Sequence, residues 1–370
     1  MSDIRLVRPY IAFKDVEAEF KEVFEGGIFT RGKYVEDFRR GISEYTGAKH
    51  AFLVSSATTA LWSCLKLLDI KQGDEVIVSD FSFPASGNVV EDLGATPIFA
   101  DVDLSTFNML PIELEQKITS RTKAVIFVAA FGNPTGITEI KAICDKYKIP
   151  LIEDAACAIG SSENGRRCGS IADLTCFSFH PRKLINTGEG GAITTNCDDF
   201  SDWLEIKLAH GAKGIKGMAL DFVSYGYNFR LPELQAIMGI KQLRKIEDIV
   251  NKRNEIRTAY IKDLHPLGFT AQQIGEKVQY NVQSLVFTVP TGCNRDGLIL
   301  GLRKCGIEST IGTYSLSNGT YYLEKYSNPQ INASILEGNT ITLPCFNDVN
   351  VDRVADTIKS IMSSIKNEGK

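Results

Sequence analysis

The chain has 370 residues, of which 44% are hydrophobic and 23% are charged, and its formal net charge is −4. A single core usually stops growing at about 250–300 residues, so two domains are expected. The net charge is small and no block of like charges occurs, which argues against nucleic acid and anionic membranes as the main partners.

The ends and the cysteines bear on where the chain works. The segment Met1–Arg5 lacks the apolar region of a secretory signal, and the longest apolar run, Ala124–Phe131, is too short to cross a bilayer. The nine cysteines are scattered and form no C-x-x-C pair, so the sequence predicts buried reduced thiols and no metal site. We therefore expect a cytoplasmic protein.

Apolar residues recur at helical spacing between Leu61 and Leu68. The pattern predicts a helix that begins between Ser55 and Thr58. The first turn of such a helix has free N–H groups and a positive dipole end, so it can hold an anion. An ordinary Ser or Thr N-cap explains the same residues equally well.

Short runs of β-branched and aromatic residues predict buried strands between Gly73 and Asn196. These strands are expected at residues 75–79, 96–100, 123–129, 150–154, 174–179 and 191–195. Between two of them, Ile137–Tyr147 has apolar residues at helical spacing. Because helical crossovers join parallel strands, the sequence predicts an α/β fold with a mainly parallel sheet flanked by helices.

The last third of the chain has a different pattern. A charged helical stretch runs from Lys245 to Arg257, a strand pattern covers Tyr280–Thr288, and a closing helix is predicted over residues 351–365. We therefore expect a large domain over residues 1–245 and a smaller α+β domain over residues 246–370.

Two side chains at predicted strand ends are candidates for chemistry. Asp154 ends a buried strand, where open α/β sheets bind their ligands. A buried carboxylate needs a partner such as a protonated ring nitrogen, although capping a helix N-terminus would serve as well. Lys183 lies between an apolar run and the Gly-rich turn Thr187–Gly191. Most lysines are solvated surface charges, so only its neighbours give Lys183 a special meaning.

These features together suit one ligand. A phosphorylated pyridine aldehyde could form a Schiff base with Lys183, keep its ring nitrogen protonated beside Asp154, and place its phosphate at the helix end near Thr58. The sequence therefore indicates pyridoxal 5′-phosphate as cofactor.

Seven motifs carry a family resemblance over nearly the whole chain. They are Ile28–Phe38, Val54–Leu61, Gly73–Val78, Glu153–Ala156, Phe177–Lys183, Thr187–Gly191 and Gly226–Leu231. In this order they resemble the sugar-nucleotide aminotransferases of the DegT/DnrJ/EryC1/StrS family. The resemblance implies the type I aminotransferase fold, with a mixed, mainly parallel sheet in the large domain.

The resemblance also implies roles for single residues. Lys183 would anchor the cofactor covalently and later carry protons, and Asp154 would pair with the pyridine nitrogen. Further cofactor contacts implied by the match are Phe83 on the ring, the Ala57 N–H, Thr58 and Ser178 at the phosphate, and Asn228 from the neighbouring subunit of a homodimer. Four residues are candidates near the substrate: Thr30, His180, His210 and Arg230.

The chain departs from the family pattern in two places that bear on the cofactor. Cys157 stands where the family usually has Gln, and a thiol is a weak hydrogen-bond donor for the phenolic oxygen of the cofactor. Ala57 replaces the usual Gly of the phosphate loop, which an N–H contact tolerates if φ is negative.

The activity implied by the resemblance is transfer of an amino group from L-glutamate to a nucleotide-linked 3- or 4-keto sugar, for surface polysaccharide or other glycoconjugates. One rival is a sugar 3-dehydratase, which carries His at the position of Lys183. Another is a ligand-sensing family member without catalysis. A dinucleotide-dependent oxidoreductase would need G-x-G-x-x-G, which Gly188–Gly191 does not fit. The segment Ile311–Tyr322 departs from the family, so the sugar, the nucleotide and the aminated carbon stay open.

Overall fold

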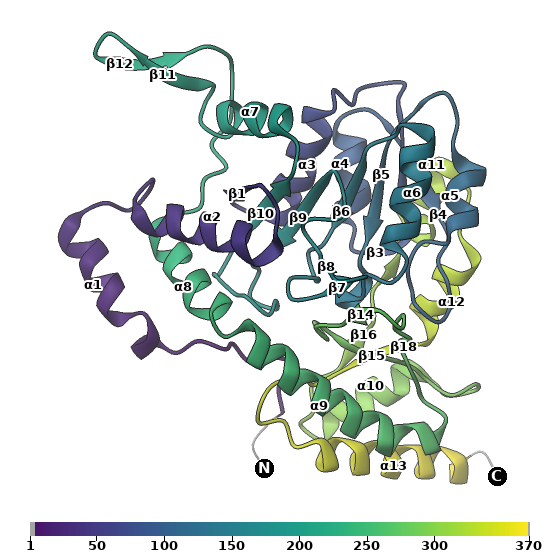
Figure 1. The fold of residues 1–370 in the computed structure, drawn as a ribbon. Helices are drawn as coiled ribbons and strands as arrows, with labels where there is room; N and C mark the ends of the chain where they lie inside the picture. The colour runs from purple at the N-terminus through teal and green to yellow at the C-terminus, as the bar shows by residue number, and fades with distance from the viewer. Residues whose placement is uncertain (1–3, 369–370) are drawn as a thin grey trace.

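The computed structural model describes residues 4–368 and is built around one sheet. The sheet has seven strands in the order β1-β10-β9-β6-β5-β2-β4 (Figure 1). Its strands are β1 (His50–Val54), β2 (Glu75–Ser79), β4 (Thr96–Ala100), β5 (Thr122–Val128), β6 (Leu151–Asp154), β9 (Leu174–Ser178) and β10 (Gly191–Thr195). The strands from β4 to β9 pair in parallel, whereas β10 pairs antiparallel with β9 and with β1. The prediction of a mixed, mainly parallel sheet is confirmed.

Both faces of this sheet are covered, which explains why its strands are continuous apolar runs rather than alternating patterns. Ile77 and Phe127 belong to a core cluster with helices α2 (Lys33–Thr46) and α6 (Ile137–Tyr147). Their neighbours along the strands belong to the opposite cluster, which includes α3 (Ala57–Leu67). The helices predicted near Thr58 and at Ile137–Tyr147 are therefore confirmed, each on one face of the sheet.

The C-terminal part of the chain has its own sheet and core. A sheet of four short strands, β13-β15-β18-β16, packs with α9 (Ile246–Leu264), α10 (Arg295–Lys304) and α13 (Val351–Glu368). The strand expected over Tyr280–Thr288 is too long, because β15 covers only Leu285–Thr288 and Val282 has a φ of 53°. A positive φ is incompatible with an extended strand. The division of the chain at residue 245 stays a prediction.

The remaining elements are short or lie at the edge of the molecule. The helices are α1 (Glu17–Gly26), α4 (Ala85–Asp92), α5 (Pro111–Lys117), α7 (Asp198–Lys207), α8 (Glu233–Leu243), α11 (Thr320–Tyr326) and α12 (Ile331–Asn339). The strands are β3 (Phe81–Ser82), β7 (Ser162–Glu163), β8 (Arg166–Arg167), β11 (Ala212–Lys216), β12 (Ala219–Phe222), β13 (Thr270–Ala271), β14 (Val278–Gln279), β16 (Thr310–Ile311), β17 (Tyr314–Ser315) and β18 (Thr340–Leu343).

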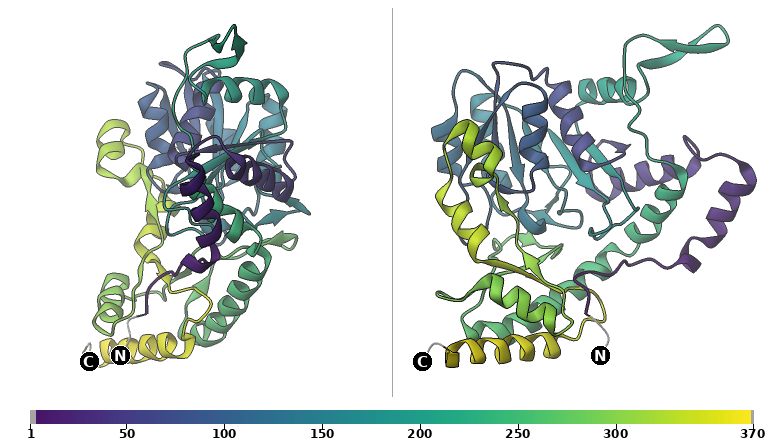
Figure 2. Two further views of the ribbon diagram at one scale, coloured as in Figure 1. Left: turned by 90° about the vertical axis from the view of Figure 1, so that its left-hand side faces the viewer. Right: turned by 180° about the vertical axis from the view of Figure 1, so that it is seen from behind.

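The hairpin of β11 and β12 projects away from the rest of the chain in every view (Figure 2). Its large apolar side chains are exposed, among them Met218 and Phe222. The helix α1 also stands at the edge, on the same side as the hairpin in Figure 1. Both elements therefore present surface that the single chain does not bury.

Two of the sequence expectations concern membranes and thiols. No helix within residues 4–368 is long and apolar enough to span a membrane. Residues 1–3, which form part of the segment judged not to be a secretory signal, lie outside the described range. All nine cysteines are free thiols, and Cys64, Cys144, Cys168, Cys176 and Cys345 are buried.

Candidate active site

A cavity opens where the parallel strands of the large sheet end. It is lined by Phe83 after β3, by Asp154 at the end of β6 and Cys157 after it, by Lys183 after β9, and by Thr313 before β17. The carboxyl ends of parallel strands meet at one edge of a sheet, so residues far apart in sequence converge there. The structure thus brings together Phe83, Asp154, Cys157 and Lys183, as the sequence predicted.

Asp154 is a buried carboxylate at the end of β6, only 6% exposed. One of its oxygens accepts a hydrogen bond from Ser86 Oγ at 2.7 Å, and the other accepts the Ala156 N–H at 3.2 Å. Burial raises the pKa of Asp154, and these hydrogen bonds with the charge of Lys183 offset only part of the rise. Turns follow Asp154 rather than a helix, so the alternative of a helix N-cap is wrong.

Lys183 lies on a short loop that is fixed on both sides of it. Its own N–H donates to the His180 carbonyl at 2.8 Å, and the next N–H, of Leu184, donates to Gln283 Oε1 at 2.8 Å. Leu184 is buried in the core beneath the loop. The side chain of Lys183 extends into the cavity, where its Nζ lies 3.0 Å from Cys157 Sγ. Buried Leu184 fixes the loop, and the half-buried side chain of Lys183 therefore places its nitrogen beside Asp154.

The expected anion site lies at the first turn of α3. Ser56 is the N-cap and accepts the Thr59 N–H at 3.1 Å, so Thr58 is not the cap. Because the first N–H groups of a helix lack intrahelical partners, those of Ala57 and Thr58 are available to an anion. Ala57 is not among the residues with a positive φ, as its N–H contact requires. Thr58 itself is exposed.

Glycine at position 191 lets three chain segments meet at this helix end. Gly191 pairs with Ser178 across β10 and β9, and a Cβ atom on Gly191 would lie 2.8 Å from the Ala57 nitrogen. Real Cβ atoms do not approach so closely, so a larger residue would push α3 away. Ser178 and the start of α3 therefore share one small, backbone-lined space.

Phe83 is not a core side chain. It is 65% exposed, and its ring lies 6.4 Å from the ring of Tyr314. Tyr314 of β17 pairs with Ser82 of β3, so its ring lies next to that of Phe83, the residue after β3. Phe83 can therefore cover a flat ligand in the cavity with its face.

The other candidate residues lie outside the set that lines this cavity. Thr30, His210 and Asn228 are exposed on loops at the edge of the chain. His180 is half-buried, and burial lowers its pKa. Arg230 differs from these, because its buried Nη1 has no hydrogen-bond partner among the described residues. Burial, with the nearby charge of Arg31, lowers the pKa of Arg230.

Sequence reasoning missed several groups that support the site. Ser86 bonds Asp154 and lies 2.9 Å from Ser82 Oγ, so a pair of hydroxyls holds the carboxylate. The spacing of these serines around Phe83 could have suggested them. Gln283 and Thr313 come from distant parts of the chain, and no local pattern indicates them.

The fold, with a lysine, a buried acid and a helix N-terminus at the strand ends of its sheet, is that of the type I pyridoxal-phosphate aminotransferases. The sequence model of the DegT/DnrJ/EryC1/StrS aminotransferase family matches residues 12–362. The chain belongs to this family. Its expected class, a pyridoxal-phosphate-dependent sugar-nucleotide aminotransferase, is confirmed.

Similar proteins agree with this assignment. The spore coat polysaccharide biosynthesis protein SpsC of Bacillus subtilis is 30% identical over 374 residues, with 97% of this chain and 96% of SpsC covered. A GDP-perosamine synthase of Vibrio cholerae is 33% identical over 347 residues, with 92% of each covered. The solved structure of the putative sugar aminotransferase Spr1654 of Streptococcus pneumoniae in its PMP form has a TM-score of 0.91 at 27% identity, with 99% of each chain covered.

Proposed function

We propose that the chain binds pyridoxal 5′-phosphate on Lys183 and uses it to transfer an amino group from L-glutamate to a nucleotide-linked 3- or 4-keto sugar. The observation that carries the proposal is that Lys183 and the buried Asp154 line one cavity. The names of the two relatives, a polysaccharide biosynthesis protein and a GDP-perosamine synthase, support a sugar acceptor and a role in making polysaccharide or another glycoconjugate.

The residues of the cavity fit the cofactor. Asp154 has two hydrogen-bond donors but is buried, so its ionised form still gains from a cation. A protonated pyridine nitrogen beside Asp154 would be this cation. The N–H groups of Ala57 and Thr58, with the Ser178 hydroxyl, would hold the phosphate, and Phe83 would cover the ring.

The bound cofactor supplies an electron sink, which stabilises negative charge on the substrate carbon. The chain's own residues do the rest. Asp154 would keep the ring nitrogen protonated, because burial, which raises the pKa of this carboxyl, also makes its charged form favour a cation at the nitrogen. Lys183, once its nitrogen is free, would carry a proton to or from the substrate carbon. The fixed loop holds the Lys183 nitrogen in the cavity, 3.0 Å from Cys157 Sγ.

The identity of the residue at position 183 favours amino transfer over the dehydratase alternative. A dehydratase of this family has His there, and this chain has Lys. The sensing alternative is disfavoured because the chain keeps Lys183 and Asp154 in one cavity with their supporting hydroxyls.

We infer that the active unit is a homodimer. The hairpin of β11 and β12 stands clear of the chain and exposes Ile215 (76%), Met218 (104%) and Phe222 (61%). Contiguous exposed apolar residues of this kind mark an interaction surface. Asn228 and Arg230 follow the hairpin in sequence, so a second chain would receive them together, and the unpartnered Arg230 would suit a substrate anion.

The direct test is to incubate the enzyme and cofactor with L-glutamate and a panel of nucleotide-linked 3- and 4-keto sugars. We expect mass spectrometry and NMR to find a new amino sugar from one of them, at the carbon that carried the ketone. Formation of a dehydrated sugar instead, or no product from any member, would contradict the proposal.

A further inference from the structure

We propose that Asp80 is a positioning residue for the sugar substrate, because it holds the segment of residues 313–317, whose Thr313 and Tyr314 form a wall of the active site. The inference rests on the proposed function, since the sugar is the substrate that this wall would contact. Asp80 directly follows β2 and is 0% exposed. It lies outside the cavity of Lys183, so it acts through the segment that it binds.

The carboxylate of Asp80 is saturated by one short segment of the C-terminal part of the chain. Its Oδ2 accepts hydrogen bonds from Ser315 Oγ at 2.7 Å and Ser317 Oγ at 2.9 Å, and its Oδ1 accepts the Ser317 N–H at 2.7 Å. The Leu316 N–H donates to the Asp80 carbonyl at 2.9 Å. Hydrogen bonds to a charged acceptor are stronger than those between neutral groups.

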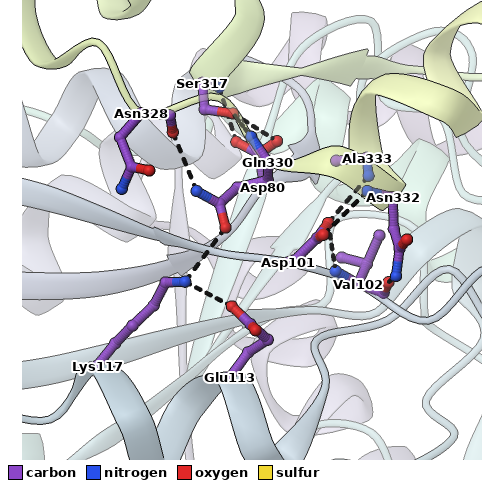
Figure 3. Close-up of polar contacts among 10 residues, drawn as sticks. All are labelled: Asp80, Asp101, Val102, Glu113, Lys117, Ser317, Asn328, Gln330, Asn332 and Ala333. Atoms are coloured by element: carbon purple, nitrogen blue, oxygen red, sulfur yellow. Dashed lines mark hydrogen bonds and ion pairs between the residues drawn. The ribbon is translucent and has the colours of Figure 1, made fainter.

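A second acid holds the continuation of this segment. Asp101, after β4, accepts the N–H groups of Asn332 at 2.9 Å and Ala333 at 3.0 Å, which are the first turn of α12. Lys117 donates to the Gln330 side chain at 3.2 Å, just before that helix (Figure 3). The segment is therefore anchored at two separate places, with Asp80 near the active site and Asp101 at α12.

The residues just before the Asp80 contacts form the wall. Thr313 lines the cavity of Lys183, and Tyr314 lies beside Phe83 and is 44% exposed. From Tyr314 a groove continues along Asn88, Leu316 and Tyr321. Tyr314 pairs with Ser82 of β3, and Ser315, the next residue, donates to Asp80, so the Asp80 hydrogen bonds help to hold Tyr314 in place.

The two proposed substrates would use this wall differently. The amino donor is small and reacts within the inner cavity. A nucleotide-linked sugar is much larger and must extend from the cavity past Phe83 and Tyr314. A shift of the wall should therefore weaken binding of the acceptor and leave reaction with the donor almost unchanged.

Burial of Asp80 is also costly, which favours a specific role. Desolvation raises the pKa of Asp80 to about 6. The hydrogen bonds from Ser315 and Ser317 lower this pKa and the charge of Asp101 raises it, each by less than burial does. Apolar contacts in such a place are often as stabilising as buried charges. A carboxylate here gains a fixed geometry, because three donors converge on it.

The test separates the two half-reactions in Asp80→Ala, Asp80→Asn and a matched control, Asp101→Ala. The donor half-reaction is followed by the spectral change on adding glutamate alone. The acceptor half-reaction is followed with enzyme already converted to its amine form and the ketosugar found in the panel. Hydrogen exchange of the cofactor-free proteins reports the mobility of residues 313–318 without any activity.

For Asp80→Ala we expect a rise of about tenfold in the apparent KM for the ketosugar, the effect of about one lost hydrogen bond, with the donor half-reaction within about twofold of wild type. Exchange of residues 313–318 should become faster. Asp80→Asn should restore most of the affinity, because its amide oxygen still accepts the Ser317 N–H. Asp101→Ala should loosen α12 but should not weaken the acceptor half-reaction more than the donor half-reaction.

The proposal would be overturned if Asp80→Ala left the KM for the ketosugar unchanged or weakened both half-reactions equally. It would also be overturned if Asp101→Ala weakened the acceptor half-reaction alone. If Asp80→Ala does not fold, Ser317→Ala gives the same readouts, because it removes one donor to the carboxylate. If the wild type aminates no ketosugar, the proposed function fails and the positioning role falls with it. If hydrogen exchange of residues 313–318 is the same in Asp80→Ala as in wild type, Asp80 does not anchor this segment, whatever the activity of the variant.

Discussion

The side-chain nitrogen of Lys183 lies 3.0 Å from the sulfur of Cys157. Cys157 is on the turn after Asp154, and the backbone carbonyl of Cys157 accepts a hydrogen bond from Asn281 Nδ2 at 2.8 Å. Cys157 is therefore held in place and faces the amine proposed to anchor the cofactor. Since a thiol is a weak donor and acceptor, it can occupy this place without competing strongly for the amine.

Replacement of Cys157 by Gln tests whether the thiol only fills this place. We expect kcat within about threefold of wild type or slightly higher, because an amide donates a stronger hydrogen bond than a thiol to the phenolic oxygen of the cofactor. Steady-state assays with the acceptor from the panel measure this, with the exposed Cys305→Ala as control. A loss above about tenfold would mean that the thiol has a role of its own.

Asp154→Asn should separate stability from catalysis. The amide oxygen can still accept the Ala156 N–H, and the amide NH2 can donate to Ser86 Oγ in place of the bond that Ser86 now donates. The amide carries no charge, and burial of the charge is what raises the pKa of Asp154. The midpoint of thermal unfolding of the cofactor-free variant should rise by roughly 2 °C or more at neutral pH. Activity should fall by about two orders of magnitude or more, because a neutral amide does not keep the ring nitrogen protonated.

Ser63→Ala provides the control for this change, since Ser63 is also fully buried but belongs to α3 away from the cavity. It should leave activity within about twofold. Full activity of Asp154→Asn, measured with the same acceptor, would contradict the assigned role of the carboxylate.

Asp80 should give the stability of the protein a pH dependence of known sign. Its pKa of about 6 lies above the ordinary value of 3.8, so the folded state binds this proton more tightly than the unfolded state. Protonated Asp80 therefore stabilises the folded state. This contribution to the free energy of unfolding is present below about pH 4 and is lost as the pH rises through about 6.

Asp80→Asn does not titrate and supplies the reference. The free energy of unfolding of wild type minus that of Asp80→Asn should therefore fall by about 2 kcal/mol from pH ~4 to pH ~7. Urea unfolding at a series of pH values measures the difference. A difference that is constant with pH, or that rises, would contradict the assigned environment of Asp80.

The hairpin prediction concerns assembly. Met218→Lys combined with Phe222→Lys places two charges on the exposed hairpin, so the proposed dimer should dissociate at least about tenfold more readily. Sedimentation measures the dissociation constant. The exposed Ile112→Lys on α5 is the control, and it should sediment as wild type does. Equal sedimentation of the hairpin variant and the control would exclude the hairpin as the interface.

The buried centre of the fold could be predicted from sequence because local patterns determine it. Strands covered on both faces are continuous apolar runs, and α6 has one apolar stripe. β1 at the edge of the sheet went unrecognised, as did the hairpin of β11 and β12, whose apolar residues are exposed. Apolar residues that the single chain leaves exposed are not part of its core, so the core pattern does not predict them.

The part of the site that lies at strand ends could also be predicted from the sequence. Lys183 and Asp154 stand at strand ends, where the ends of parallel strands converge. The anchor of Asp80 was not predictable, because its partner Ser315 is 235 positions away and both residue types are common in loops. Only the packing of the C-terminal segment on the sheet edge brings them together.

The absorbance spectrum of the purified protein tests the central claim most directly. We expect wild-type protein loaded with pyridoxal 5′-phosphate to keep a visible yellow band through dialysis and to lose it when L-glutamate is added. Lys183→Ala should lose the band on dialysis, whereas the exposed Lys123→Ala should keep it. A band that persists in dialysed Lys183→Ala, or a wild-type spectrum that glutamate leaves unchanged, would contradict the account.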